Sequence, residues 1–319
     1  MEKFLITGGA GYIGSHMALL LLNQGNEVKV LDKLPLEEAS RLKPVLDNSN
    51  FSYCQIDLSE QGKISYEFKD FKTIIHLAAS ADISLGFKQS DLDLKQGTLL
   101  TYSVLEAMRR SGVKEIIFSS SGTVYGYPFK IPTPEDSGMI LPISLYGASK
   151  LASESLISAF CYFYDMQSWI FRFGNIIGKD STRGVIYDLV TKIQSNKSEL
   201  EVLGDGEQLK DYVYLDDCME AMLKAHNEAN ERVNVFNIGS DSNISVKEVV
   251  RIILEEMNLE NVKIRYSGGP RGWLGGGWPG DIAKVLFDIS KLKKLGWKPK
   301  FNSKEAVTKA IQETLQNFA

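Results

Sequence analysis

The stretch KFLITGGAGYIG, residues 3–14, joins a short apolar run to Gly8, Gly11 and Gly14, which are spaced three residues apart. A helical pattern of apolar residues follows it. A Cβ at these glycines would block a tight turn and keep the backbone away from a pyrophosphate. The N-terminus of the following helix offers unpaired N–H groups and a partial positive charge to an anion. The stretch therefore predicts a dinucleotide-binding strand–turn–helix unit, with further contacts from Tyr12 and Ile13.

The next expected strand, residues 27–32, ends in an acid at the distance that such a unit requires. The Asp32 carboxylate can accept hydrogen bonds from the adenosine ribose, whereas a 2′-phosphate there would meet like charge. This favours NAD over NADP, although Lys33 is a neighbouring cofactor-site cation that would tolerate a phosphate. Asp57 and Leu58 follow another strand-like run and are placed to flank the adenine; a helix N-cap is the alternative for Asp57.

Apolar strands alternate with amphipathic helices through the first half of the chain. We expect strands at residues 73–79, 115–121 and 169–175, and helices at residues 99–110 and 146–164. This alternation predicts a parallel sheet covered on both faces, which is a doubly wound α/β fold of the Rossmann type.

The regular alternation of strands and helices ends after residue 175. A hairpin-like piece covers residues 199–215, and residues 233–245 begin with another buried strand that is expected to rejoin the main sheet. We therefore predict an NAD-binding domain of residues 1–175, rejoined by about 233–245. Residues 176–232 and 246–319 are expected to form a smaller, discontinuous α/β substrate domain.

The composition is that of an ordinary globular protein, with 319 residues, 44% hydrophobic, 24% charged and a net charge of -4. There is no long basic run, so a nucleic-acid partner is not expected. The N-terminus lacks the apolar region of a signal peptide, and no apolar stretch is long enough to span a bilayer. Cys54, Cys161 and Cys218 are scattered without metal-ligand spacing. We expect a cytoplasmic protein with reduced thiols, no metal and no membrane partner.

Tyr146 and Lys150 form a Y-x-x-x-K pair whose side chains share one face of the expected helix. A nearby cation stabilises a phenolate and lowers the pKa of a tyrosine, which can then act as a general base. Such a pair is also common by chance. The catalytic interpretation of the pair is supported by SSSGTVYG, residues 119–126. Its hydroxyls follow a strand at the sheet edge where ligands bind. His76 also ends a strand, and a buried structural role is favoured for it over catalysis.

Taken in order, TGGAGYIG, HLAA, SSSGTVYG, YGASK and RFGN resemble the extended short-chain dehydrogenase/reductase superfamily. Within it the chain is similar to NAD-dependent sugar-nucleotide epimerases, nearest to UDP-galactose (UDP-glucose) 4-epimerases, over residues 3–315. The resemblance implies that Tyr146 is the general base and that Lys150 is its partner and a ribose ligand. Ser121 would hydrogen-bond the reacting oxygen of the sugar.

The resemblance also implies a set of binding residues. Further cofactor contacts are expected from Leu77, Ala78, Ala79, Ser119 and Phe173. Substrate contacts are expected from Asn175 and Lys210 at the diphosphate, from Gly184, Val185, Ile186 and Tyr187 at the base, and from Thr123, Arg271 and Asp281.

The chemistry so implied is the 4-epimerisation of a UDP-hexose or a related nucleotide sugar. Tyr146 removes the C4 hydroxyl proton while NAD⁺ takes the hydride, the 4-keto sugar turns over, and the hydride returns to its other face. In the family, helices matching residues 99–110 and 146–164 form the four-helix bundle of a homodimer; core packing explains the same apolar pattern. A sugar-nucleotide 4-oxidase/reductase that releases the keto product and a non-catalytic NAD sensor remain the alternatives.

Three departures from the family pattern stand out. Gly122-Thr123 occupies the place of the Asp-Glu pair of related 4,6-dehydratases, so dehydration is not expected. Gly97 and Leu100 replace an Asn and a Gly that relatives often carry. The loop at residues 271–281 resembles an expanded Arg…Pro-Gly-Asp segment, because removing LGGGW would restore RGWPGD, and its Trp273 and Trp278 could reshape or close the pocket.

Overall fold

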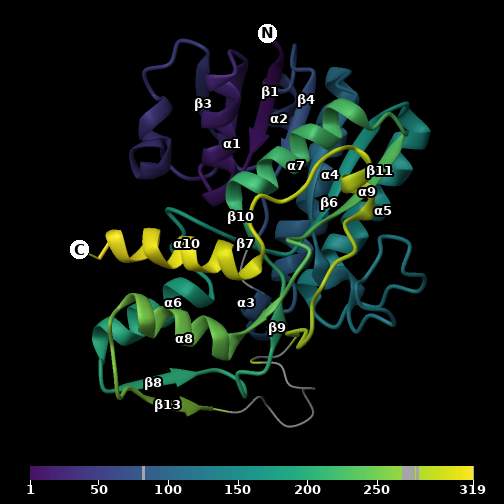
Figure 1. Cartoon of the computed structure of the whole chain (residues 1–319). Helices are drawn as coiled ribbons and strands as arrows, with labels where there is room; N and C mark the ends of the chain where they lie inside the picture. Colours follow the sequence, from purple (N-terminus) through teal and green to yellow (C-terminus); the bar gives the residue numbers. More distant parts are fainter. Residues whose placement is uncertain (81–82, 268–276, 278–279, 319) are drawn as a thin grey trace. The chain divides into compact units, whose positions relative to one another are not determined.

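A seven-stranded sheet forms the centre of the first of two compact units in this computed structural model, which describes residues 1–80, 83–267, 277 and 280–318 (Figure 1). The spatial order is β11-β6-β5-β4-β1-β2-β3. The strands are β1 (Lys3–Thr7), β2 (Glu27–Asp32), β3 (Phe51–Gln55), β4 (Thr73–His76), β5 (Glu115–Ser121), β6 (Gln167–Phe173) and β11 (Val233–Ile238). The pairs β1–β2, β1–β4, β2–β3 and β4–β5 are parallel. The predicted doubly wound Rossmann-type fold is confirmed, and the order of the strands reverses between β1 and β4.

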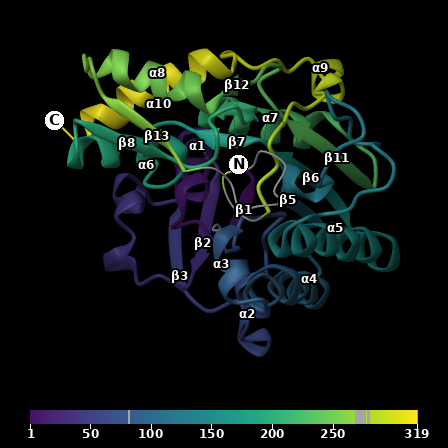
Figure 2. The ribbon, with the colours of Figure 1, turned by 90° about the horizontal axis from the view of Figure 1, so that it is seen from below.

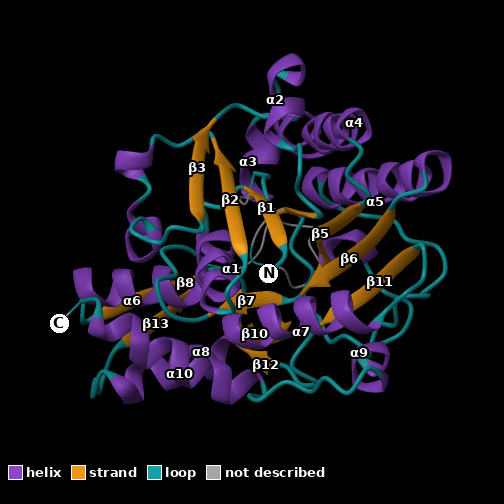
Figure 3. Cartoon of the chain, turned by 90° about the horizontal axis from the view of Figure 1, so that it is seen from above, coloured by secondary structure: helices purple, strands orange, loops and turns teal. Residues whose placement is uncertain are grey.

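Helices cover both faces of this sheet. They are α1 (Tyr12–Asn23), α2 (Gln61–Glu67), α3 (Ile83–Lys88), α4 (Leu100–Ser111) and α5 (Leu145–Tyr164), with 3₁₀ turns η1 (Leu36–Glu38) and η2 (Ser40–Val45) and a π-helical turn η3 (Leu94–Leu99). One buried cluster joins α2, α4 and α5 to the strands through residues such as Ile64, Val104, Ile157 and Ile116. Figure 2 and Figure 3 show α4 and α5 side by side. α4 ends where Gly112 adopts a left-handed conformation.

The second unit contains three short strand pairs and a layer of helices. Its strands are β7 (Asn175–Ile177), β8 (Glu199–Val202), β9 (Leu209–Lys210), β10 (Tyr212–Tyr214), β12 (Ile244–Ser245) and β13 (Lys263–Tyr266). Its helices are the 3₁₀ turn η4 (Gly122–Tyr125), α6 (Val185–Ser195), α7 (Leu215–Glu228, whose last residues belong to the first unit), α8 (Val246–Glu256), α9 (Ser290–Lys294) and α10 (Ser303–Gln316). The apolar faces of α6, α8 and α10 share one core, and Asn302 with Glu305 forms a capping box at the start of α10.

The hairpin expected at residues 199–215 is wrong. β8 pairs in parallel with β13, whereas β9 pairs antiparallel with β12. Gly204 and Gly206 both have positive φ, and the chain turns there instead of folding β8 back onto β9.

The two units divide the chain at other points than the sequence indicates. The first unit holds residues 1–120, 145–171 and 226–235, and the second holds residues 121–144, 172–225 and 236–319. Residues 121–144 therefore group with the second unit, where Thr133 N donates to Leu286 O at 2.9 Å. Residues 226–232 group with the first unit, where Trp169 Nε1 donates to Ala229 O at 3.1 Å.

In the described part of the chain, no helix combines the length and apolar character needed to cross a bilayer. The three cysteines are free thiols. No group of His, Cys, Asp and Glu among the same residues has an arrangement that would hold a metal ion.

Candidate functional site

The glycine-rich turn between β1 and α1 needs glycine for two separate reasons. Gly8 has φ +72°, and a Cβ there would lie 2.7 Å from Ala78 N. At Gly14 a Cβ would lie 2.5 Å from the Gly8 carbonyl oxygen, so this residue permits the close approach of helix and turn. Gly11, the N-cap residue of α1, has no side chain to cap the helix. The turn therefore leaves room for an anion next to the N–H groups of Tyr12 and Ile13.

Asp32 ends β2 beside this turn. Its Oδ2 accepts a hydrogen bond from Ala10 N at 3.0 Å, and its Oδ1 accepts one from Leu34 N at 3.1 Å. A carboxylate has about four acceptor sites, so ribose hydroxyls can still bind to it. Lys33 is exposed next to it.

Asp57 does not cap a helix, so that alternative is wrong. α2 begins at Gln61, and its N-cap residue is Glu60. Asp57 Oδ1 instead accepts a hydrogen bond from Ser59 N at 2.9 Å, and this bond holds the pKa of the Asp57 carboxyl below its usual value. Leu58 is buried in the core of the first unit.

Strand register brings the expected cofactor residues of the first unit to one sheet edge. Thr7 pairs with His76, and His76 pairs with Phe118. Gly8, Leu77 and Ser119 follow these three residues, so they lie along the carboxyl ends of neighbouring strands. Ala78 and Ala79 continue from β4 and are half-buried.

His76 has the structural role that the sequence favours. It is fully buried between two hydroxyls, with Nδ1 2.7 Å from Thr7 Oγ1 and Nε2 3.1 Å from Thr101 Oγ1. Burial, and then the charge of Lys150, lowers the pKa of His76 to about 3, so the ring is neutral at physiological pH.

Lys150 and Tyr146 lie near the start of α5. Lys150 is 3% exposed, and its Nζ donates to Ser119 O at 2.7 Å. The same atom lies 4.8 Å from the centroid of the Phe118 ring and 5.7 Å from that of the Tyr146 ring. Burial lowers the pKa of Lys150 to about 8, although Glu154 and Asp93 oppose this shift. The ammonium can therefore stabilise a phenolate at Tyr146.

Sequence analysis missed Glu154, Ser120 and Asp93, all of which are buried. Glu154 accepts a hydrogen bond from Ser120 Oγ. Glu154 stands four residues after Lys150, so the spacing rule that paired Tyr146 with Lys150 would have found it. Asp93 has no comparable local signal.

The structure explains why Gly97 departs from the family pattern. A Cβ at Gly97 would lie 2.6 Å from Ser149 Oγ, so η3 packs against α5 at a distance that only glycine allows without a shift. Leu100 is half-buried against the main core and supplies apolar contact in place of a glycine.

In the second unit, Ser121 and Thr123 form a pair of hydroxyls. Ser121 Oγ accepts a hydrogen bond from Thr123 N at 3.2 Å and another from Thr123 Oγ1 at 2.9 Å. A Cβ at the intervening Gly122 would collide with the Phe287 ring. The space that a side chain at position 122 would occupy is thus filled by Phe287.

Lys210 has a buried partner. Its Nζ donates to Asp281 Oδ1 and to the carbonyl oxygen of Ile282. Asp281 Oδ2 accepts a hydrogen bond from Gly277 N at 3.0 Å. Arg271, Trp273 and Trp278 lie outside the described residues.

The remaining expected substrate residues lie on strand and helix ends of the second unit. Asn175 is exposed, and its Nδ2 donates to Asp211 O at 3.3 Å. Phe173 is half-buried two residues earlier. Gly184, with φ +89°, precedes α6 without a side-chain cap. Val185, Ile186 and Tyr187 form the first turn of that helix, and the Tyr187 ring is 5.9 Å from that of Phe318.

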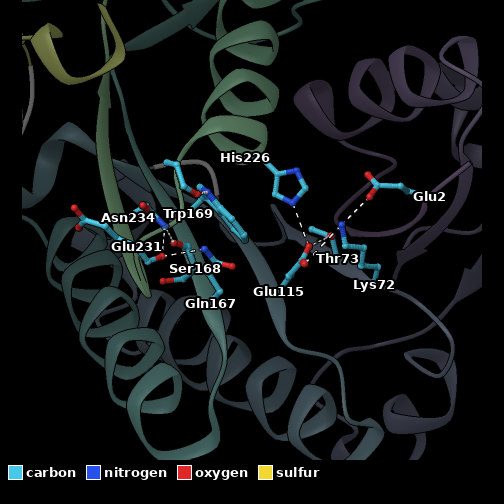
Figure 4. A network of polar contacts seen from close by, with 11 residues as sticks. Glu2, Lys72, Thr73, Glu115, Gln167, Ser168, Trp169, His226, Glu231 and Asn234 are labelled. Carbon is cyan, nitrogen blue, oxygen red and sulfur yellow. Dashed lines mark hydrogen bonds and ion pairs between the residues drawn. The ribbon is translucent and has the colours of Figure 1, made fainter. Parts of the chain in front are cut away.

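A separate polar network lies around the amino ends of β4 and β5 (Figure 4). Glu115 accepts hydrogen bonds from Thr73 Oγ1 at 2.6 Å and from His226 Nε2 at 3.2 Å, and Lys72 donates to Glu2 at 2.7 Å. Glu2, Lys72, Glu115 and His226 are among the residues that line a cavity of about 240 Å³. Because they bond to one another at the edge opposite to Gly8 and Ser119, the network stabilises the unit and is not part of the candidate site.

Comparison with known proteins identifies a family and its chemistry. The model of the NAD dependent epimerase/dehydratase family matches residues 4–239. The UDP-glucose 4-epimerase of Halalkalibacterium halodurans is 30% identical over 322 residues, covering 95% of this chain and 92% of its own. A crystal structure of a UDP-galactose 4-epimerase has a TM-score of 0.87 and 30% identity, covering 99% of this chain and 100% of its own. MoeE5 in complex with UDP-glucuronic acid and NAD has a TM-score of 0.86 and 27% identity, covering 99% of each chain.

Proposed function

We infer that the chain, which belongs to the NAD dependent epimerase/dehydratase family, is an NAD-dependent enzyme that epimerises C4 of a nucleotide-linked sugar. The observation that carries this function is the buried Lys150 ammonium beside the Tyr146 ring. Oxidation of a C4 hydroxyl needs a base for its proton, whereas a protein that only senses NAD does not.

The residues of the first unit fit NAD. The glycine turn leaves a cradle that a Cβ would fill, and Asp32 offers acceptors to ribose hydroxyls. NAD held there would supply the acceptor for the hydride of C4 and the donor for its return to the opposite face of the sugar. Tyr12, Ile13, Lys33, Asp57, Leu58, Leu77, Ala78, Ala79, Ser119 and Phe173 remain its further expected contacts.

The proton at C4 is handled by side chains of the chain itself. Tyr146 takes it as a phenolate that Lys150 stabilises, and gives it back after the sugar has turned. Both hydrogen bonds that join Ser121 Oγ to Thr123 are accepted by Ser121. We propose that the Ser121 hydroxyl therefore donates its own proton to the reacting oxygen, with Thr123 holding it in place.

A UDP-linked sugar is the proposed substrate, because the compared relatives act on or bind UDP-sugars. We assign Asn175 and Lys210 to the diphosphate on the strength of the sequence resemblance. Gly184, Val185 and Tyr187 are assigned to the nucleotide base. Arg271 and Asp281 are kept as substrate residues on the strength of the sequence resemblance.

A homodimer in the cytoplasm completes the proposal. Several side chains on α4, on α5 and at the end of η3 are apolar and exposed, among them Leu99, Tyr102, Tyr162 and Phe163. A second copy of the chain would bury them.

Tyr146→Phe tests the catalytic assignment. The variant should bind NAD normally but lose turnover by roughly 10²–10⁴-fold, because the phenol proton is removed. The purified protein would be incubated with UDP-sugars and then GDP-sugars, with products separated by chromatography and the NADH absorbance followed. Tyr127→Phe is the matched control, because Tyr127 is 44% exposed and has no proposed role.

The products decide between the possible reactions. A mixture of C4 epimers without lasting NADH supports the proposal and names the sugar. Stoichiometric NADH with a keto product would make the chain a dehydrogenase instead. Full turnover by Tyr146→Phe would remove this residue from the mechanism.

A further inference from the structure

The Lys150 ammonium is buried, and burial of a charge away from water is energetically unfavourable. The side chain is 3% exposed, and its Nζ donates to a neutral carbonyl, Ser119 O, at 2.7 Å. Aromatic rings and a carbonyl replace only part of the lost hydration of an ammonium. Without further negative charge, the group would tend to become neutral and would then stabilise a phenolate poorly.

Glu154 supplies negative charge from the same helix. It lies one turn beyond Lys150 on α5, where side chains four residues apart share a face, and it is 6% exposed. Its carboxylate accepts a hydrogen bond from Ser120 Oγ. Ser120 directly follows Ser119. Two neighbouring residues of β5 therefore bond to the Lys150 ammonium and to the Glu154 carboxylate, which lie one turn apart on α5.

Asp93 supplies negative charge from a second element. It precedes η3, is 2% exposed, and its Oδ2 lies against Gly86 next to Leu145 at the start of α5. η3 is fixed to α5 at Ser149, whose carbonyl oxygen accepts a hydrogen bond from Thr98 Oγ1 at 3.3 Å. Because Gly97 has no side chain, this approach can be close.

The titratable groups around Lys150 come from three elements. They are Glu154 and Tyr146 on α5, Asp93 before η3 and His76 on β4, and His76 is neutral. Glu154 and Asp93 both raise the pKa of Lys150, against the effect of burial. The two carboxylates therefore act in the same direction on one cation.

We propose that Glu154 and Asp93 are positioning residues that keep the Lys150 ammonium charged and directed toward Tyr146, an assignment that rests on the proposed roles of Tyr146 and Lys150. Neither carboxylate reacts with the sugar. Their effect passes through Lys150 to the phenol, because a charged neighbour favours the phenolate and a neutral one does not.

Glu154→Gln and Asp93→Asn remove the charges with little change in shape. Each should lower the pKa of Lys150 and so move the alkaline limb of the kcat profile, where the ammonium loses its proton, to lower pH by about one unit, with rates recovering at lower pH. Initial epimerisation rates would be measured on the full chain with NAD, using the UDP-sugar that the product assay identifies. NAD affinity and thermal unfolding would be recorded in parallel.

Matched variants separate charge from shape. Glu154→Asp keeps the charge and should retain a profile close to wild type, whereas Glu115→Gln removes a carboxylate at the other end of β5 and should leave the profile unchanged. If Glu154→Gln does not fold, Asp93→Asn decides the matter by itself.

Tyr146→Phe and Lys150→Met are measured beside Glu154→Gln and Asp93→Asn. They distinguish failure of the proposed function from failure of the positioning role. Turnover that survives in Tyr146→Phe would overturn the proposed function together with this inference. If that variant is inactive while Glu154→Gln and Asp93→Asn keep the wild-type pH profile, only the positioning role is wrong.

Discussion

Gly8 and Gly25 have nearly the same backbone conformation but very different surroundings. Their φ angles are +72° and +80°. A Cβ at Gly8 would lie 2.7 Å from Ala78 N, whereas one at Gly25 would find nothing within 4 Å. The pair separates the cost of a left-handed conformation from the cost of a backbone collision.

Gly8→Ala should therefore be more harmful than Gly25→Ala. Both variants should lose about 1 kcal/mol of stability from positive φ, and Gly8→Ala should lose about 1–3 kcal/mol more because the Ala78 backbone must move. NAD affinity should fall by at least about tenfold in Gly8→Ala only. Denaturant unfolding and calorimetric NAD titration measure both effects. Equal losses in the two variants would contradict the steric explanation.

At the scale of elements, α4 and α5 carry apolar residues on both of their faces. The inner faces pack Val104, Met108 and Ile157 into the main core. Leu99, which ends η3 directly before α4, is 50% exposed, and Phe163 on α5 is 82% exposed. Helices of a monomer usually have a polar outer face, so this pattern favours burial against a second copy.

Leu99→Glu should weaken such a dimer. A carboxylate at the centre of an apolar helix interface would be desolvated without a partner, so dissociation should increase by at least tenfold. Sedimentation velocity over a range of concentrations measures the change. Phe129→Glu is the control, because Phe129 is 84% exposed on a different segment. A wild-type protein that sediments as a monomer would refute the dimer.

At the scale of the whole molecule, each of the two units buries a titratable group, and the two groups have opposite effects on the pH dependence of stability. In the first, burial lowers the pKa of His76 to about 3, so below pH 6.5 the unfolded state binds a proton that the folded state does not. In the second, burial raises the pKa of Asp211 to about 6, so between 3.8 and 6 the folded state binds the extra proton. Acidification through this range therefore lowers the free energy of unfolding of the first unit through His76 and raises that of the second unit through Asp211.

Hydrogen exchange read separately for each unit should show this difference. From neutral pH to about pH 4, the His76 contribution should cost the first unit on the order of 3 kcal/mol, while the second unit is less affected. His76→Asn should flatten the response of the first unit, since Asn does not titrate there. If both units lose protection in parallel, and the variant behaves like wild type, His76 is not the cause.

Local chemistry made the central features predictable from sequence. The positive φ of Gly8, the close approach at Gly14, the acid that ends β2 and the i,i+4 pairing of Tyr146 with Lys150 each depend on a few neighbouring residues. Strand and helix periods are equally local. The α/β fold and the cofactor edge of the sheet followed from them.

The tertiary structure decided what depends on distant contacts. The hairpin at residues 199–215 was wrong because β8 found a partner in β13, more than sixty residues away. Asp93 meets Lys150 only because η3 packs on α5, and Lys210 meets Asp281 only through the fold of the second unit. Burial lowers the pKa of Lys150, and burial belongs to the folded chain. The sequence alone therefore determined the motifs and their periods, whereas the fold determined which charges face one another.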